Sequence, residues 1–528
     1  MNKFFKIFNV LLLTIILLLV GFLLGKKYDF VYNEQDRIVG VSSNKNEQKI
    51  KRLVALIDQQ YINPINSDSI VDQTINFMVG NLDPHSTYLD KKMIKLAEEE
   101  QSGSFLGVGL NYKILNDTIV VTRTIPGTVN SNKLKFGDRI LAVNNTAVTG
   151  KNVNLFASLV KENNENAILD FKISRDHKIS VQKLKNTSVP IPTVVGKHMI
   201  NEDIGYLKLI RFGEKSAVEV HQGLQDLLNQ GMKTLVFDLR GNPGGLINVA
   251  EQIADEFLKE KELIVYTEDK SKQKKYAYAT AKGLFQEGKI YVLIDENSAS
   301  ASEIIAGAIQ EYDRGVIVGR RSFGKGLVQR EIDLGDGTKV RLTVAKYYTP
   351  AGRSIQRPYE KGNQVYADDL HQRLKSGELY SKDSIKVNEK LKYKAPSGKI
   401  VYGGGGIMPD EFVPFDISSV SNWLNYNNDS QLYHDYIVKK ADKFHNLFLL
   451  ENENRFVNYF GAGILRNDFL NLIGVPPNQF DKSLSATIDN YIKATLAQEL
   501  FGSYAYYKIW LPEDEMIKKV LELERTKS

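Results

Sequence analysis

Two short segments contain side chains that could do chemistry. The first, NSASASE at residues 297–303, places three serines among alanines directly after the apolar stretch IYVLID. Small residues there let a substrate backbone approach closely, and the start of a following helix favours developing negative charge. One serine is enough to cap a helix, so three indicate a nucleophile as well as a cap. The residue types alone do not distinguish Ser298, Ser300 and Ser302.

The second segment, GRRSFGKG at residues 319–326, contains Lys325 between two glycines. It begins like a phosphate-binding loop, G-x-x-x-x-G-K. Such a loop continues with serine or threonine and opens a helix, whereas here Gly326 follows and LVQREIDLGDG has strand-like alternation. Ser322 and Lys325 also form the S-x-x-K pattern of penicilloyl-serine enzymes, but the glycines disfavour its helix and no K-T-G occurs. Neither a nucleotide site nor a penicillin-binding site is expected.

A serine nucleophile needs a base. The histidines nearest to the serines in the sequence, His221 and His371, lie in no recognisable motif. A lysine can take the role when burial disfavours its charged form and lowers its pKa. Lys325 lies among glycines just after an apolar strand, a position that suits such a base. The common alternative is a lysine that only forms an ion pair. The two segments together predict serine chemistry with a lysine base.

The stretch from Asn297 to Gln329 resembles the signature of the carboxy-terminal processing proteases, also called tail-specific proteases. The segments DLRGNPGGL (238–246), YYTPAGRSIQ (347–356) and GGGGIMPD (403–410) occur in that family's order, and the resemblance covers about residues 50–415. It implies a serine endopeptidase that cleaves proteins recognised through their C-terminal tails. It also implies a mechanism that needs no metal and no cofactor.

The resemblance assigns roles to individual residues. The nucleophile would be Ser300, the general base Lys325, and the residue that positions the lysine Gln329. The oxyanion hole would use two backbone N–H groups, one from Ala301 and one from either Gly244 or Gly245.

Residues 102–189 predict a small domain of short strands with one or two helices. This region resembles a PDZ domain, because KFGDRILAVNN (135–145) matches one family segment and FLGVGL (105–110) matches the carboxylate-binding loop. In that loop, backbone N–H groups bind a peptide C-terminus and the peptide adds as a strand. The expected peptide-binding residues are Phe105, Leu106, Gly107, Val108, Gly109 and Leu110.

The chain as a whole predicts a multidomain α/β and α+β protein. Residues 190–420 alternate strand and helix, which favours a largely parallel sheet and forms the expected protease core. A polar helical region precedes the PDZ-like domain at 31–101, and a helical region with many aromatic residues follows the core at 421–528. In that last region PEDEMIKKVLEL predicts a helix opened by Pro512.

The N-terminal segment, residues 1–30, predicts a membrane anchor. No charged residue occurs from Ile7 to Gly25, and lysines flank the run on both sides. At helical rise this length just spans a hydrocarbon core of about 30 Å. No A-x-A-like cleavage site follows. We therefore expect a single-pass protein of a bacterial cytoplasmic membrane whose catalytic part faces the periplasm or the outside, or a secreted protein if the segment is cleaved.

Composition narrows the remaining classes of site. The chain has 528 residues and no cysteine, which excludes disulfides, thiolate catalysis and cysteine zinc sites. Seven scattered histidines predict no metal site, and a net charge of +6 over this length predicts no nucleic-acid binding. The expected partners are protein substrates and the membrane, with a homo-oligomer or an adaptor left open. The alternative, a PDZ scaffold that binds tails without cutting them, is disfavoured because Ser300, Lys325 and Gln329 are all present.

Overall fold

The computed structural model describes residues 45–161, 163–415, 452–472 and 481–526, together with 435–436, 438–440 and 442. The predicted anchor at Ile7–Gly25 lies outside the described residues. Within the described ranges no helix is both long and apolar enough to cross a membrane. The chain divides into two compact units, residues 1–77 and 78–528. Helices α2 (Lys45–Gln60) and α3 (Ser67–Gly80) agree with the helical region expected from the sequence.

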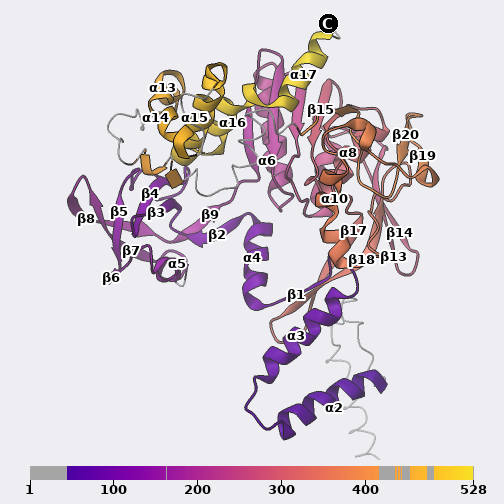
Figure 1. The fold of residues 1–528 in the computed structure, drawn as a ribbon, viewed down its shortest axis with the longest axis horizontal. Coiled ribbons are helices and arrows are strands. Elements are labelled where there is room, and N and C mark those ends of the chain that lie inside the picture. Colours follow the sequence, from indigo (N-terminus) through magenta and orange to yellow (C-terminus); the bar gives the residue numbers. More distant parts are fainter. Residues whose placement is uncertain are drawn as a thin grey trace, which may run out of the picture. The chain divides into compact units, whose positions relative to one another are not determined.

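The second unit contains a six-stranded sheet. Its strand order is β10 (Val194–Met199), β11 (Ile204–Leu209), β12 (Thr234–Asp238), β15 (Lys289–Ile294), β16 (Val316–Gly319) and β21 (Glu411–Phe412), and Figure 1 labels β15 near the centre of this order. β10 pairs antiparallel with β11, and all the other neighbours are parallel. This arrangement confirms the largely parallel sheet. The carboxyl ends of its central strands lead into the segments that could do chemistry.

Helices cover both faces of this sheet, which explains why its strands are apolar on both sides. One face packs against α6 (Ser216–Asn229), α7 (Ile247–Asp255) and α8 (Ala301–Glu311) through residues such as Leu207, Phe237 and Val292. The other face packs against α17 (Glu515–Thr526). The residues that meet there include Tyr206, Val236, Leu293, Met516, Ile517 and Val520. The end of the chain therefore completes the core of the parallel sheet.

The predicted start of the last helix, at Pro512, is wrong, because α17 begins at Glu515. Residues Leu511–Glu513, which include Pro512, form a separate 3₁₀ turn, and the helix begins at Glu515. Asp514 lies between the two, and its Oδ1 accepts hydrogen bonds from the N–H groups of Met516 at 2.9 Å and Ile517 at 3.2 Å. An aspartate in this position satisfies helix N–H groups that otherwise lack partners, so Asp514 acts as the cap.

A second sheet carries the segment after Lys325. β17 (Leu327–Asp333) pairs antiparallel with β18 (Lys339–Tyr348), as its alternation predicted. β18 also pairs with β13 (Leu263–Asp269), which pairs with β14 (Lys274–Tyr278). The segment NLDPHSTYL (81–89) turns after α3, and its end forms β1 (Thr87–Leu89) on the edge of β18. The pairing of β1 with β18 places the turn at residues 81–86 near β17, the strand that follows Lys325.

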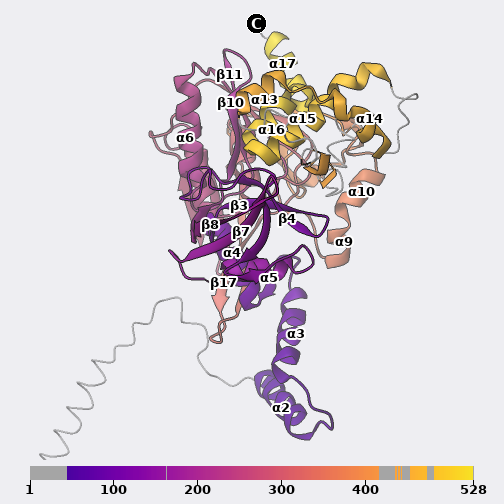
Figure 2. The ribbon, with the colours of Figure 1, turned by 90° about the vertical axis from the view of Figure 1, so that its left-hand side faces the viewer.

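The PDZ-like domain has a hydrophobic core and a sheet of its own, and Figure 2 shows the ribbon of the sheet. β3 (Leu110–Leu115), β4 (Thr118–Thr124), β5 (Arg139–Val143), β7 (Ile168–Arg175) and β8 (Lys178–Lys185) form the sheet, with β6 (Thr146–Ala147) paired to β5. Phe156 of α5 (Val153–Lys161) packs against the sheet with Ile119 and Phe171. β2 (Ser104–Gly107) and β9 (Thr187–Pro190) pair where the chain enters and leaves the domain, after α4 (Lys91–Ser102).

The described part of the C-terminal region is helical, as expected. It contains α13 (Glu453–Tyr459), α14 (Gly463–Leu472), α15 (Ser485–Phe501) and α16 (Ser503–Trp510), whose aromatic side chains form a separate core. Its residues contact both neighbours: Glu499 lies 3.5 Å from Lys113 of the PDZ-like domain, and the Tyr504 hydroxyl donates to Val194 O of the core at 3.1 Å. Four further elements follow β18 and precede β21 along the chain: α9 (Asn363–Ala367), α10 (Asp369–Lys375), β19 (Lys392–Lys394) and β20 (Ile400–Tyr402).

Candidate active site

The three serines of the 297–303 run have different surroundings. Ser298 Oγ donates to Leu239 O at 2.9 Å, and Ser302 Oγ donates to Asn242 O at 3.0 Å. Both side chains are fully buried, whereas Ser300 is partly exposed. The two buried hydroxyls therefore hold the turn together, and Ser300 is the member of the run that a substrate can reach.

The backbone of Ser300 is strained. It lies between β15 and α8 with φ 55° and ψ −112°, outside the regions that residues with a Cβ normally occupy. A Cβ added to Gly244 would lie 2.8 Å from Ser300 Cβ and 2.9 Å from Ala301 N. Glycine is therefore required at position 244, because any side chain would collide with the turn at Ser300 and Ala301.

Lys325 lies in the loop between β16 and β17 and is half-buried. Burial is the main cause that lowers the pKa of its amine, and Arg341 lowers that pKa further, while Glu303 and Asp83 oppose the shift. The pKa therefore lies below the usual value of a lysine, as a general base requires. Among the described residues no hydrogen bond joins the Lys325 amine to the Ser300 hydroxyl. Such contacts are often long before substrate binds.

A buried carboxylate joins the two segments. Glu303 Oε2 accepts hydrogen bonds from Ser300 N at 2.8 Å and from Lys325 N at 2.9 Å. Its Oε1 accepts from Ser322 Oγ at 2.5 Å and from Gly324 N at 2.7 Å. Burial raises the pKa of Glu303, and these four donors oppose that rise. The serine turn and the lysine loop are thus fixed to one side chain.

The Tyr347 hydroxyl forms a second link between these segments. It lies 3.0 Å from the carbonyl oxygen of Ser300 and 2.6 Å from that of Lys325. The tyrosine is buried on β18. The backbones of Ser300 and Lys325 are therefore linked twice, by Glu303 of α8 and by Tyr347 of β18.

Gln329, on β17, contacts a different group from the one expected. Its Nε2 donates to Thr343 Oγ1 at 3.2 Å, and Thr343 Oγ1 donates to Asp83 Oδ1 at 3.1 Å. Asp83 also accepts from the Ser86 hydroxyl at 2.6 Å. Within the described part of the chain Gln329 makes no hydrogen bond to Lys325. The turn at residues 83–86 is thereby connected, through Thr343, to strand β17, which follows Lys325.

One histidine does lie near the lysine. His85 Nε2 is 2.9 Å from the Tyr366 hydroxyl, and burial, helped by the charge of Lys325, lowers the His85 pKa to about 4. The ring is therefore neutral at neutral pH. The two histidines nearest to the serines in the sequence, His221 and His371, pair with Glu256 and Asp368 on exposed surface. Only the pairing of β1 with β18 reveals the position of His85.

The loop at residues 240–245 provides backbone donors. Gly244 N already donates to Asn242 Oδ1 at 2.9 Å, and Gly244 O accepts from Phe212 N at 2.9 Å. The N–H groups of Gly245 and Ala301 donate to no described residue. Of the two glycines that the sequence left open, Gly245 is therefore the one with an unused N–H.

The predicted carboxylate loop lies between β2 and β3. Gly109 has φ +67°, and a Cβ there would lie 3.0 Å from Thr128 Cγ2. The N–H groups of Val108 and Gly109 donate to no described residue. Phe105, Leu106 and Leu110 flank the loop and are partly exposed, whereas Gly107 is buried.

Comparison with known proteins identifies the family of this chain. The model of peptidase family S41 matches residues 203–363, and that of the PDZ domain matches residues 95–173. The carboxy-terminal-processing protease of Bartonella bacilliformis is 33% identical over 339 residues, which cover 60% of this chain and 75% of that protein. This chain belongs to the carboxy-terminal processing proteases. The family makes it a serine-type peptidase.

A second relative points to the same family. The carboxy-terminal processing protease CtpB of Bacillus subtilis is 30% identical over 363 residues, covering 66% of this protease and 74% of CtpB. A solved structure of a photosystem II D1 C-terminal processing protease covers 60% of this chain and 85% of its own at 26% identity. Its TM-score of 0.35 is too low to add to the sequence matches.

Proposed function

We propose that this protease cleaves peptide bonds with Ser300 as the nucleophile and Lys325 as the general base. The observation that carries the proposal is the shared carboxylate of Glu303. It accepts hydrogen bonds from the backbone N–H of Ser300, the accessible serine of the 297–303 run, and from that of Lys325, whose pKa is lowered. A fluorophosphonate probe should label Ser300 in the folded chain. A PDZ scaffold without activity would take up no label and leave a tail-bearing protein intact.

The steps follow from these positions. Neutral Lys325 removes the proton of the Ser300 hydroxyl as Oγ attacks the substrate carbonyl carbon. The N–H groups of Ala301 and Gly245 stabilise the oxyanion, and the loss of one such donor typically lowers the rate about 100- to 1,000-fold. The protonated lysine gives its proton to the leaving amine, and the amide C–N bond breaks. Water, deprotonated by Lys325, then hydrolyses the acyl-enzyme ester.

Two charged residues near Lys325 shift its pKa in opposite directions, which allows a test of its role as the base. Asp83 raises the pKa of Lys325 and Arg341 lowers it. We expect the rise of kcat/KM with pH to move to lower pH in Asp83→Asn and to higher pH in Arg341→Gln, each by on the order of half a pH unit. A pH series of kcat/KM measures both shifts. Shifts of the same sign, or none, would show that another group titrates. Thermal melting of each variant controls for misfolding.

Gln329 is proposed to position the lysine through strand β17. Its amide holds Thr343, which contacts Asp83, so the loss of this side chain would loosen the strand that carries the lysine loop.

The PDZ-like domain is proposed to bind the C-terminal carboxylate of the substrate. An L-residue at position 109 is strained at φ +67° and meets Thr128, so Gly109→Val should obstruct the loop. Cleavage of a tail-bearing protein is expected to fall about tenfold, while fluorophosphonate labelling of Ser300 falls less. Gly127→Val is a matched control, because that glycine also has a positive φ of +78° but faces open space.

The substrate gives an independent comparison. The wild-type protease is expected to cleave a peptide with a free C-terminus faster than the same peptide with an amidated one. Equal rates would remove the case for carboxylate recognition. The side chains beside the loop, Phe105, Leu106 and Leu110, favour an apolar tail. We further propose that the run Ile7–Gly25 anchors the protease in the membrane with its catalytic part outside the cytoplasm.

A further inference from the structure

The loop at residues 240–245 is held by the parallel-sheet core at three places. Gly241 N donates to Asp295 Oδ1 at 2.9 Å. Asn242 O accepts from Ala299 N at 3.0 Å, and Gly244 O accepts from Phe212 N at 2.9 Å. These contacts join the loop to the serine turn, to the residue directly after β15 and to the segment that follows β11. The first residue of the loop, Arg240, is held differently.

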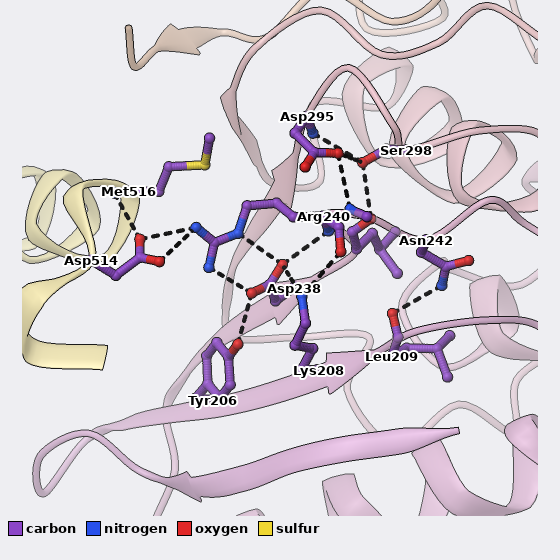
Figure 3. A network of polar contacts seen from close by, with 12 residues as sticks. Tyr206, Lys208, Leu209, Asp238, Arg240, Asn242, Asp295, Ser298, Asp514 and Met516 are labelled. Atoms are coloured by element: carbon purple, nitrogen blue, oxygen red, sulfur yellow. Dashed lines mark hydrogen bonds and ion pairs between the residues drawn. The ribbon is translucent and has the colours of Figure 1, made fainter. Parts of the chain in front are cut away.

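Arg240 lies between two carboxylates (Figure 3). Its Nε and Nη2 donate to Asp238 at 3.0 and 2.6 Å, and its Nη1 lies 2.9 and 2.8 Å from the two oxygens of Asp514. Lys208 Nζ donates to Arg240 O at 3.0 Å and lies 3.3 Å from Asp238 Oδ1. The Tyr206 hydroxyl donates to Asp238 Oδ2 at 2.7 Å. Both the side chain and the carbonyl of Arg240 are thereby fixed.

The cluster is balanced in charge, with two carboxylates and two cations. Asp238 is fully buried; burial alone would raise its pKa, but Arg240 and Lys208 hold that pKa well below its usual range. Asp238 is therefore ionised, and it satisfies two of the guanidinium nitrogens. The third nitrogen depends on Asp514. The Arg240 side chain is largely buried, at 16% exposure, so the loss of this partner leaves part of its charge poorly compensated.

Asp514 is part of another region of the chain. It lies between the 3₁₀ turn at Leu511–Glu513 and α17. In the described part of the chain it is the one hydrogen-bonding anchor of this loop that comes from the C-terminal helices. Residues 241–244 contact the core, and Arg240 is the residue at which a contact from outside the core joins the loop.

We infer that Asp514 is a positioning residue for the peptidase reaction. By fixing Arg240 it holds the loop so that the N–H of Gly245 meets the oxyanion formed at Ser300. The inference rests on the proposed function. It also gives the C-terminal helical region a role in catalysis, in addition to covering the sheet.

Asp514→Asn separates this role from helix capping. Asparagine caps a helix as well as aspartate does, so the bonds to Met516 and Ile517 are retained while the charge facing Arg240 is lost. Asp514→Ser is a second variant that caps but is too short to reach Arg240. Glu524→Gln is the matched control: Glu524 is on the same α17 and accepts from the Tyr291 hydroxyl at 2.8 Å, near the amino ends of the strands.

The measurements are kcat and KM on a tail-bearing protein, the rate of fluorophosphonate labelling, and the melting temperature. Asp514→Asn and Asp514→Ser are expected to lower kcat and the labelling rate about 10- to 100-fold with KM within twofold of wild type. Asp514→Glu, which keeps the charge, should recover part of the loss. Glu524→Gln should keep kcat within twofold.

Three outcomes would overturn the inference: unchanged kcat in both Asp514 variants, a change confined to KM, or an equal loss of kcat in Glu524→Gln. The last would mean that docking of α17 in general, and not Arg240, sets the rate. A failure of the proposed function would be distinct, because then wild-type protein would take up no label and Ser300→Ala would change nothing.

Discussion

Replacing Lys325 with arginine is expected to lower kcat/KM about 1,000-fold or more, although the positive charge is kept. A guanidinium does not release its proton near neutral pH, so it cannot accept the proton of the Ser300 hydroxyl. Lys325→Met and Ser300→Ala are expected to be as inactive. The measurement is cleavage of a tail-bearing protein at constant substrate concentration. Substantial activity in Lys325→Arg would show that another group is the base.

The lowered pKa of Lys325 fixes the sign of two further effects. Below that pKa the amine is protonated and inactive, so the rate should rise with pH, with a midpoint below the usual lysine value. Burial also means that the folded state disfavours the charged form. At pH 7 Lys325→Met should therefore melt at a higher temperature than wild type while being inactive. A lower melting temperature together with lost activity would mean that the lysine holds the fold.

Much of the core could be predicted from local sequence. The strands β12, β15 and β16 are short apolar runs bounded by turn residues, and the helices between them have clear spacing. The alternation of strand and helix then implies parallel pairing. The sequence could not choose among the three serines, because the partners of Ser298 and Ser302 come from the 239–242 segment, distant in the sequence.

The parts that the sequence did not reveal depend on long-range pairing. Asp83 and His85 reach the lysine only because β1 adds to the edge of β18. The role of Asp514 was not predicted because proline favours the first turn of a helix, so the sequence predicts a helix start at Pro512. Pro512 belongs instead to the 3₁₀ turn, and the helix cap is the aspartate two residues later. Glu303 was overlooked because a glutamate three residues after a serine is fully explained as a capping partner.

That capping role accounts for one of the four hydrogen bonds of Glu303, and the other three come from the lysine loop. Glu303→Gln keeps the shape, but an amide nitrogen donates where the carboxylate oxygen accepted. Two of the four donors would then face another donor. Each unsatisfied buried group costs about 1–3 kcal/mol, so the variant should melt at a clearly lower temperature.

The activity of folded Glu303→Gln is expected to fall about 100-fold, because the serine turn and the lysine loop would no longer share one acceptor and a misplacement of about 1 Å has this effect. Glu311→Gln is the matched control. Glu311 ends the same helix, is fully buried, and accepts from Arg353 Nε at 2.6 Å, away from the proposed dyad. It should lose stability but keep kcat per folded molecule. If Glu303→Gln kept its kcat, or if both variants lost kcat equally, the carboxylate would be holding the helix and not the geometry of Ser300 and Lys325.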